Sequence, residues 1–159
     1  MIFVAVGTQK FPFNRLLKAV DDLIEQGVLT EEVFAQVGHS DYVPRNYAYK
    51  DFLSKEDFHA RISGCDLLIT HSGVATIIAG LKLYKPVVVV PRHAQYAEHV
   101  DDHQVQIAES FSEKNLLVMC SQPDDLAEAV SYAKTHTFAK YVSQRDLVIT
   151  TIREYLENI

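Results

Sequence analysis

Short apolar runs alternate with longer amphipathic segments along the chain. The apolar runs are rich in β-branched residues, have the length of buried strands, and lie at 2–6, 33–37, 47–52, 66–70, 87–90 and 115–119. Between them, apolar residues recur every three or four positions, which predicts helices over about 13–24, 55–62, 74–83, 100–111, 123–134 and 138–159. This alternation is typical of a parallel sheet flanked by helices. We therefore predict a single α/β domain, 1–159, with a Rossmann-like parallel sheet.

Two of the expected helices carry further signals. Ser54 precedes one of them, and its hydroxyl is suited to cap the first turn, where Asp57 adds a favourable negative charge. The last helix, over 138–159, has an apolar stripe that is broad for a surface helix. We expect this stripe either to pack onto the sheet or, in part, to dock a second protein.

Composition and charge narrow the class of protein. The 159 residues suit one domain, and 48% apolar with 23% charged residues is ordinary for a globular chain. No run approaches the roughly 20 apolar residues of a membrane-spanning helix, and residues 1–9 lack the basic region of an export signal. We therefore expect a cytoplasmic protein in which Cys65 and Cys120 remain free thiols. Fifteen basic against 21 acidic residues give a net charge of −6, and without a basic cluster nucleic acid is not an expected partner.

The turn after the first strand is one candidate for ligand binding, since ligands of parallel sheets bind beyond the carboxyl ends of the strands. It consists of Gly7, Thr8 and Gln9. Glycine permits close backbone approach, and the following N–H groups with the Thr8 hydroxyl are suited to an anion. The alternative is that a small residue stands here for packing.

The turn between the 66–70 strand and the next helix is a second candidate. It contains His71, Ser72 and Gly73, and Thr76 follows in the first helical turn. A helix N-terminus favours phosphate, because its N–H groups are unpaired and the helix dipole is positive there. The hydroxyls and His71 would add donors, although a histidine at a strand end is also common as a structural residue.

The polar loop after the 87–90 strand is the third candidate, because it is expected at the same edge of the sheet. Its polar side chains are dense, and the candidate ligand contacts are Arg92, Glu98, His99, Asp102, His103 and Gln104. Arg92 is suited to phosphate, while Asp102 and Gln104 are suited to sugar hydroxyls.

Two other kinds of chemistry are less well supported by this loop and the second turn. A metal site could use His93, His99 and His103, but no recognisable zinc spacing or cysteine accompanies them. A serine-hydrolase site would need the Gly-x-Ser-x-Gly elbow, which the sequence around Ser72 lacks.

Several of these segments follow one another in an order that resembles the donor-binding half of family 28 glycosyltransferases. They are 71–76 (HSGVAT), 85–91 (KPVVVVP) and 102–104 (DHQ). The segments 1–9 and 98–104 most resemble the small soluble subunits of bacterial β-1,4-galactosyltransferases of capsule and exopolysaccharide synthesis. The peptidoglycan UDP-GlcNAc transferase and the soluble subunit of the eukaryotic dolichol-linked UDP-GlcNAc transferase share the same order. The resemblance runs from residue 1 to about 130.

The resemblance implies a single donor-binding lobe of the two-lobed GT-B fold, which binds a UDP-sugar without a metal or other cofactor. The residues implied to line the diphosphate are Gly7, Thr8, Ser72, Gly73 and Thr76, with Gln104 and its neighbours facing the donor sugar. Related transferases commonly have a glutamate three residues after the Thr76 equivalent, where it would hold the ribose. Ala79 stands there in this chain, so ribose is expected to be held weakly or by other groups.

A complete enzyme of this fold has two lobes, and a domain of this length supplies one. The resemblance therefore implies a membrane-anchored companion subunit that binds a lipid-linked saccharide and holds this chain at the inner face of the membrane. The expected reaction transfers a hexose, by the resemblance galactose, from UDP to an acceptor hydroxyl, with Arg92 or His71 stabilising the departing UDP and the general base supplied by the partner. The alternatives are a non-catalytic subunit and an epimerase-like enzyme that also binds a UDP-sugar.

Overall fold

A computed structural model of the chain describes residues 1–99, 101–141 and 152–157. The strands are β1 (Ile2–Ala5), β2 (Val33–Gln36), β3 (Ala48–Lys50), β4 (Leu67–Thr70), β5 (Val87–Val89) and β6 (Val118–Met119). The helices are α1 (Asn14–Glu25), α2 (Lys55–Gly64), α3 (Val74–Lys82), α4 (His103–Glu113) and α5 (Leu126–Thr135). Short 3₁₀ helices, η1 (Ala94–Tyr96) and η2 (Pro123–Asp125), precede α4 and α5, and residues 152–157 are helical.

The strands form one parallel sheet in the order β3-β2-β1-β4-β5-β6. This is the strand order of the Rossmann fold, so the predicted fold class is confirmed. Strands β1, β4 and β5 are buried along their whole length, because helices cover both faces of a parallel sheet. That explains why these strands are continuous apolar runs in the sequence.

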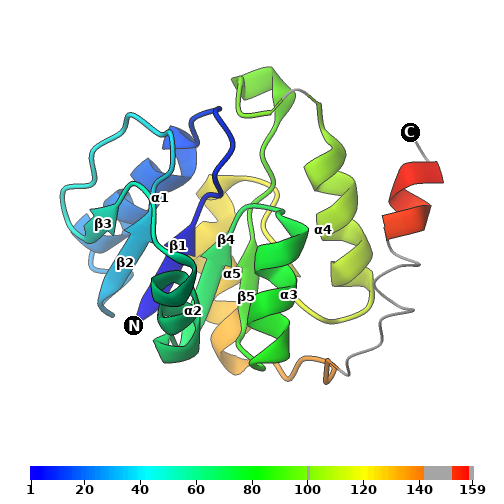
Figure 1. The fold of residues 1–159 in the computed structure, drawn as a ribbon. Coiled ribbons are helices and arrows are strands. Elements are labelled where there is room, and N and C mark those ends of the chain that lie inside the picture. The colour runs from blue at the N-terminus through cyan, green and yellow to red at the C-terminus, as the bar shows by residue number, and fades with distance from the viewer. Residues whose placement is uncertain (100, 142–151, 158–159) are drawn as a thin grey trace.

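The helices form two layers, one on each face of the sheet (Figure 1). In β1, Ile2 and Val4 pack with α1 and α5, whereas Phe3 and Ala5 pack with α2, α3 and α4. Successive side chains of a strand point to opposite faces, so the four residues of β1 contribute to both halves of the core.

A side-chain cap sets the beginning of α2, whereas α4 begins without one. The Ser54 hydroxyl accepts a hydrogen bond from the Asp57 N–H at 3.1 Å, as predicted. Helix α4 begins at His103, later than the expected residue 100, and just before it the Asp101 carboxylate accepts from the His103 N–H at 3.0 Å.

The prediction of a helix from residue 138 is wrong at its beginning, since 138–141 are not helical. The Ala139 N–H donates to the Asn115 carbonyl at 2.8 Å, and Tyr141 is buried in the core, so tertiary contacts hold this segment instead. Within the stripe proposed for docking, Ile152 and Tyr155 lie beside Phe111 of α4. The positions 142–151 and 158–159 lie outside the described residues, and docking by this segment stays a prediction.

In the described part of the chain, every helix is too short or too polar to cross a bilayer. Cys65 and Cys120 are buried free thiols, as predicted. Burial raises the pKa of the Cys120 thiol to about 11, so this cysteine stays protonated at neutral pH.

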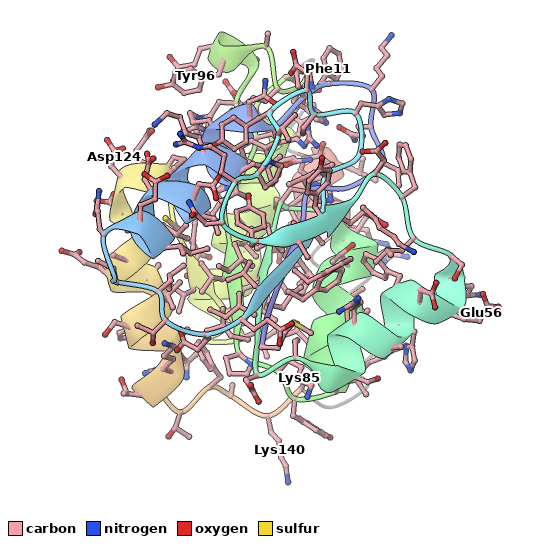
Figure 2. All side chains as sticks on the ribbon, turned by 90° about the vertical axis from the view of Figure 1, so that its left-hand side faces the viewer. Phe11, Glu56, Lys85, Tyr96, Asp124 and Lys140 are labelled. Atoms are coloured by element: carbon pink, nitrogen blue, oxygen red, sulfur yellow. The ribbon has the colours of Figure 1, made fainter. Side chains whose placement is uncertain are left out.

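The order in which successive strands join the sheet reverses at its centre, between β1 and β4. After β1 the chain enters α1 on one face, and after the neighbouring β4 it enters α3 on the other face. The two connections diverge and leave a crevice beyond the carboxyl ends of β1 and β4, which is where open α/β sheets bind ligands. Figure 2 shows Phe11 and Tyr96, which follow β1 and β5, at one end of the molecule, and Lys85 and Lys140 at the opposite end.

Candidate functional site

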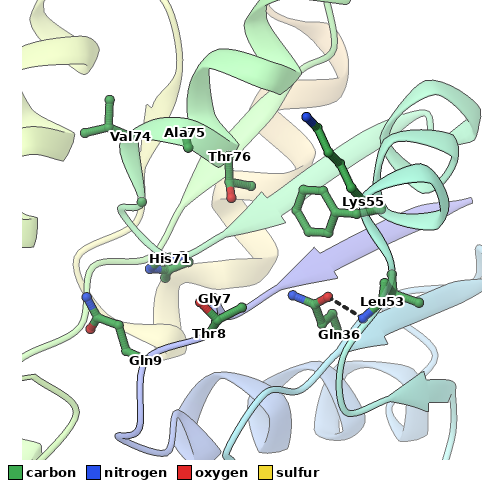
Figure 3. A pocket seen from close by; sticks show the side chains of 12 residues that line it. Gly7, Thr8, Gln9, Gln36, Leu53, Lys55, His71, Val74, Ala75 and Thr76 are labelled. Carbon is green, nitrogen blue, oxygen red and sulfur yellow. Dashed lines mark hydrogen bonds between the residues drawn. The ribbon is translucent and has the colours of Figure 1, made fainter.

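A cavity of about 520 Å³ occupies this crevice, within the range of about 300–1,000 Å³ that is usual for small-molecule sites. It is lined by Gly7, Thr8, Gln9, Gln36, Leu53, Lys55, Phe58, His71, Gly73, Val74, Ala75 and Thr76. Figure 3 shows Gln9 and His71 at one end of the cavity, and Gln36, Leu53 and Lys55 at the other. The first two turns predicted from the sequence therefore meet at one site.

The N-terminus of α3 forms one wall of the cavity. Gly73 is its N-cap, and the first turn has no side-chain cap and no acidic residue. The first N–H groups of a helix have no partner within the helix, and the dipole makes this end positive. The N–H groups of 74–76 and the Thr76 hydroxyl are thus placed to receive an anion from the cavity.

The opposite end of the cavity combines apolar surface with polar groups. Leu53 and Phe58 supply the apolar surface, and Lys55 adds a positive charge. The Gln36 Oε1 accepts from the Leu53 N–H at 2.9 Å, which leaves the amide nitrogen of Gln36 for a ligand. Because the described lining residues include no Asp or Glu, this cavity suits an anion with an attached apolar group.

The four residues at this end were not identified from the sequence: Gln36, Leu53, Lys55 and Phe58. One signal for Gln36 was available. It is the polar residue of an otherwise apolar strand and stands at its carboxyl end, where ligands of parallel sheets bind. Leu53 comes from the β3–α2 connection, and Lys55 and Phe58 come from the first turn of α2; their local sequence carries no signal for a site.

Gly7 and Gly73 hold the His71 ring between them. A Cβ atom at Gly7 would lie 2.5 Å from His71 Nε2, and one at Gly73 would lie 2.5 Å from His71 Cε1. Gly7 also has φ +84°, which side chains other than glycine rarely adopt. Both glycines are therefore required by the histidine, and the three residues form one rigid unit at the mouth of the crevice.

The His71 imidazole is uncharged in the folded chain. It is buried, and burial together with the nearby charge of Arg92 lowers its pKa to about 3. A buried neutral imidazole carries no net charge and offers one donor nitrogen and one acceptor nitrogen.

The lowered pKa of His71 predicts an acid-sensitive fold. Below pH 6.5 the unfolded chain binds a proton at His71, whereas the folded chain binds one only near pH 3. The contribution of this group to the free energy of unfolding is therefore fully present above pH 6.5 and is lost as the pH falls. Between pH 7 and pH 5, the free energy of unfolding of the native protein should fall by about 2 kcal/mol more than that of His71→Gln. Urea unfolding at both pH values measures this, and equal losses in the two proteins would show that His71 takes up protons in the folded state.

The structure corrects the role expected of Arg92. Its side chain is 1% exposed, and its guanidinium donates to the carbonyls of Phe11 (2.7 Å), Glu98 (3.0 Å) and Val6. Val6 and Phe11 flank the loop that carries Gly7, Thr8 and Gln9. Arg92 therefore ties both ends of this loop to the β5 connection, and its engaged donors are not free for a phosphate.

Glu98 also stabilises the loop after β5 through hydrogen bonds within the protein. It is 2% exposed, accepts from Arg15 at 3.0 Å through both carboxylate oxygens, and accepts from the His93 N–H at 3.1 Å. Asp102 is exposed and accepts from the Ala94 N–H at 2.9 Å. In this structure neither carboxylate lines the cavity, so the predicted ligand contacts of Glu98 and Asp102 have no support from their positions.

The remaining predicted residues lie around a second cavity of about 240 Å³. It adjoins the first, since both are lined by Gln9, His71, Gly73 and Val74. Ser72, His99, His103 and Gln104 also line it, and the Ser72 hydroxyl is buried without a partner among the described residues. His99 and His103 place Nδ1 at 3.2 and 3.0 Å from the Asp101 carboxylate.

Within 1–99, 101–141 and 152–157, no group of three or more His, Cys, Asp or Glu side chains is arranged to hold a metal ion. In particular, His93 lies apart from His99 and His103, with its Nε2 3.3 Å from the Ser121 carbonyl. The described residues thus give no support to the alternative of a metal site in this loop.

The chain matches the family described as glycosyltransferase family 28 C-terminal domain over residues 1–154. No curated protein sequence matches it.

Solved structures share its fold. The solution structure of ALG13 is 22% identical, with a TM-score of 0.62, and the match covers 99% of this chain and 96% of ALG13. The glycotransferase of kitacinnamycin is 19% identical, with a TM-score of 0.65 over 97% of this chain and 38% of that enzyme. MurG of Acinetobacter baumannii is 19% identical, with a TM-score of 0.53 over 94% of this chain and 49% of MurG. The chain thus spans less than half the length of these two larger proteins.

Proposed function

Because this chain belongs to the glycosyltransferase family 28 C-terminal domain family, with the fold of a GT-B donor-binding lobe, we propose that it is the UDP-sugar-binding subunit of a two-component hexosyltransferase. The observation that carries the proposal is the uncapped N-terminus of α3, which opens into an acid-free cavity at the crevice between β1 and β4. A nucleoside diphosphate combines an anion with a flat, partly apolar base, and both ends of the cavity suit it.

In the proposed complex, the diphosphate lies against the first turn of α3 and against Gly7 and Thr8. The uracil lies at the apolar end of the cavity, beside Leu53 and Phe58, where the free amide nitrogen of Gln36 is a donor for a carbonyl of the base. The ribose then lies between these ends. Its usual glutamate contact is absent, and Ala79 packs against the core instead; Lys55 is the charged side chain among the described lining residues.

Transfer of the hexose leaves UDP with an additional negative charge. The α3 N–H groups and the His71 imidazole are already oriented toward this region, so they stabilise the departing diphosphate without rearrangement. The proposed chemistry places this role on protein donors rather than on a metal ion. Hexose bound to the diphosphate would extend into the second cavity, beside His99 and His103.

The acceptor lobe is proposed to lie in a membrane-anchored companion subunit, which presents a lipid-linked saccharide to this chain at the cytoplasmic face. The match to ALG13 covers 99% of this chain and 96% of that protein, which supports the proposal that a single lobe of this size is a separate protein chain. By the resemblance of 1–9 and 98–104 to capsule and exopolysaccharide galactosyltransferase subunits, we propose galactose as the hexose.

Isothermal titration calorimetry with UDP tests the proposal directly. Native protein should bind UDP, and His71→Ala should weaken binding about tenfold, because one hydrogen bond to a charged oxygen contributes about 1.5 kcal/mol. His71→Gln, whose side-chain amide can also donate, should recover most of the loss. Unchanged affinity in His71→Ala would remove His71 from the diphosphate site, and absence of binding by the native protein would contradict the proposed function.

A further inference from the structure

We infer that Gln104 is a positioning residue that fixes the tautomer of His71, so that the ring presents an Nε2–H donor to the diphosphate. The inference deepens the proposed function and rests on it for the identity of the ligand. It assigns to Gln104 a different role from the direct sugar contact that the sequence resemblance implies.

The orientation of the Gln104 amide is determined by its neighbours. Its Oε1 lies 3.0 Å from the Arg92 backbone nitrogen and 3.3 Å from the Ser72 backbone nitrogen. Both partners are N–H groups that can only donate, so the atom between them must be the oxygen. The reversed amide would place its NH₂ against two donors in a site that is 4% exposed, at a large desolvation cost.

The Gln104 nitrogen therefore faces His71, with Nε2 3.2 Å from His71 Nδ1. An amide nitrogen only donates, so His71 Nδ1 must accept and carries no proton. In a neutral imidazole the proton then resides on the other nitrogen. The neutrality of His71 is independently favoured by its burial, which lowers its pKa to about 3.

The protonated nitrogen points where a ligand would lie. His71 Nε2 is at the mouth of the crevice between Gly7 and Gly73, within 2.6 Å of the position that a Cβ would take on either residue. The structure gives this nitrogen no hydrogen-bond partner within the described residues. A neutral N–H donor without a protein acceptor, at the edge of a cavity that ends on a helix N-terminus, is suited to a phosphate oxygen.

The same amide joins the first turn of α4 to two of the connections that build the site. Gln104 is the second residue of α4; it accepts from the β5 connection at Arg92 and from the β4 connection at Ser72, and it donates to His71. Because Oε1 and one hydrogen of Nε2 are engaged in these contacts, the main action of Gln104 on the ligand is assigned to its hold on His71.

The tautomer can be measured on the free protein by ¹⁵N NMR of the histidine rings, with His71→Gln used to identify the signals of residue 71. We expect His71 to show a protonated Nε2 and an unprotonated Nδ1 between pH 5 and pH 8. In Gln104→Glu, where a carboxylate accepts rather than donates, Nδ1 should become protonated. A protonated Nδ1 in the native protein would overturn the inference. The measurement needs no ligand, so it stands even if the protein fails to bind UDP.

Calorimetry separates positioning from sugar contact. In Gln104→Met, the affinities for UDP and for UDP-galactose should fall together, by about threefold or more, with their ratio unchanged within twofold. The exposed Gln106 of the same helix provides the matched control, and Gln106→Met should leave both affinities unchanged. A selective loss of UDP-galactose affinity, fivefold or more beyond the loss for UDP, would assign Gln104 to the sugar and overturn the inference.

Discussion

Replacing Gly7 with alanine is expected to reduce the affinity for UDP about 100-fold, or about 2.7 kcal/mol. The new Cβ would lie 2.5 Å from His71 Nε2, and the ring cannot retreat because Gly73 contacts its other side and Gln104 bonds to Nδ1. The φ of +84° adds backbone strain of about 1–2 kcal/mol. The loop that carries Thr8 and Gln9 should therefore shift away from the diphosphate. Calorimetry with UDP measures the effect.

Gly27 provides the control for backbone strain alone. It has a similar conformation, with φ +72°, but no atom lies within 4 Å of a Cβ placed on it. Gly27→Ala should lower the free energy of unfolding by about 1 kcal/mol and leave UDP affinity unchanged. Equal UDP affinities in Gly7→Ala and in the native protein would show that the β1 turn does not contact the nucleotide.

Replacing Arg92 with methionine is expected to lower the free energy of unfolding by about 3–5 kcal/mol. The guanidinium donates to the carbonyls of Val6, Phe11 and Glu98, and methionine would leave these buried acceptors unpaired. Glu98 would also lose the positive charge that lies beside it. The midpoint of urea unfolding should fall accordingly, with the β1 connection losing protection from amide hydrogen exchange first.

The exposed Arg45 serves as the control for removing an arginine. It pairs with Glu25 at 3.1 Å, with 65% of its side chain exposed, and exposed pairs contribute little to stability. Arg45→Met should therefore show no measurable change in urea unfolding. An Arg92→Met variant as stable as Arg45→Met would mean that the three carbonyls find other donors, and would contradict the role given to Arg92.

The centre of the sheet could be predicted from the sequence because β1, β4 and β5 are continuous apolar runs that are buried along their whole length. The turns after β1 and β4 could be predicted as well, since position at the carboxyl end of a strand is visible in a linear sequence. The start of the final segment, 138–141, could not be predicted, because the apolar side chains of Phe138 and Tyr141 fit a helical period yet are held in a non-helical segment by contacts with distant parts of the chain.

The polar loop after β5 shows where sequence reasoning fails for the site. Arg92, Glu98 and Gln104 were expected at a ligand because hydrogen-bonding side chains are dense in this loop, at the edge of the sheet where ligands bind, but all three are buried and bonded to backbone groups. Their partners lie in loops far away in the sequence, so no local pattern distinguishes residues that build a site from residues that contact its ligand. Lys55 and Phe58 line the cavity because α2 packs beside α3, a tertiary contact that the local sequence does not reveal.

The central claim is that the crevice between β1 and β4 binds uridine diphosphate. Titration of UDP into ¹⁵N-labelled protein, followed by amide chemical shifts, tests it most directly. The account predicts that the largest shifts occur at Gly7, Thr8 and Gln9 and at the first turn of α3, 74–76. Shifts concentrated at the opposite end of the sheet, around Lys85 and Lys140, or no shifts at millimolar UDP, would contradict it.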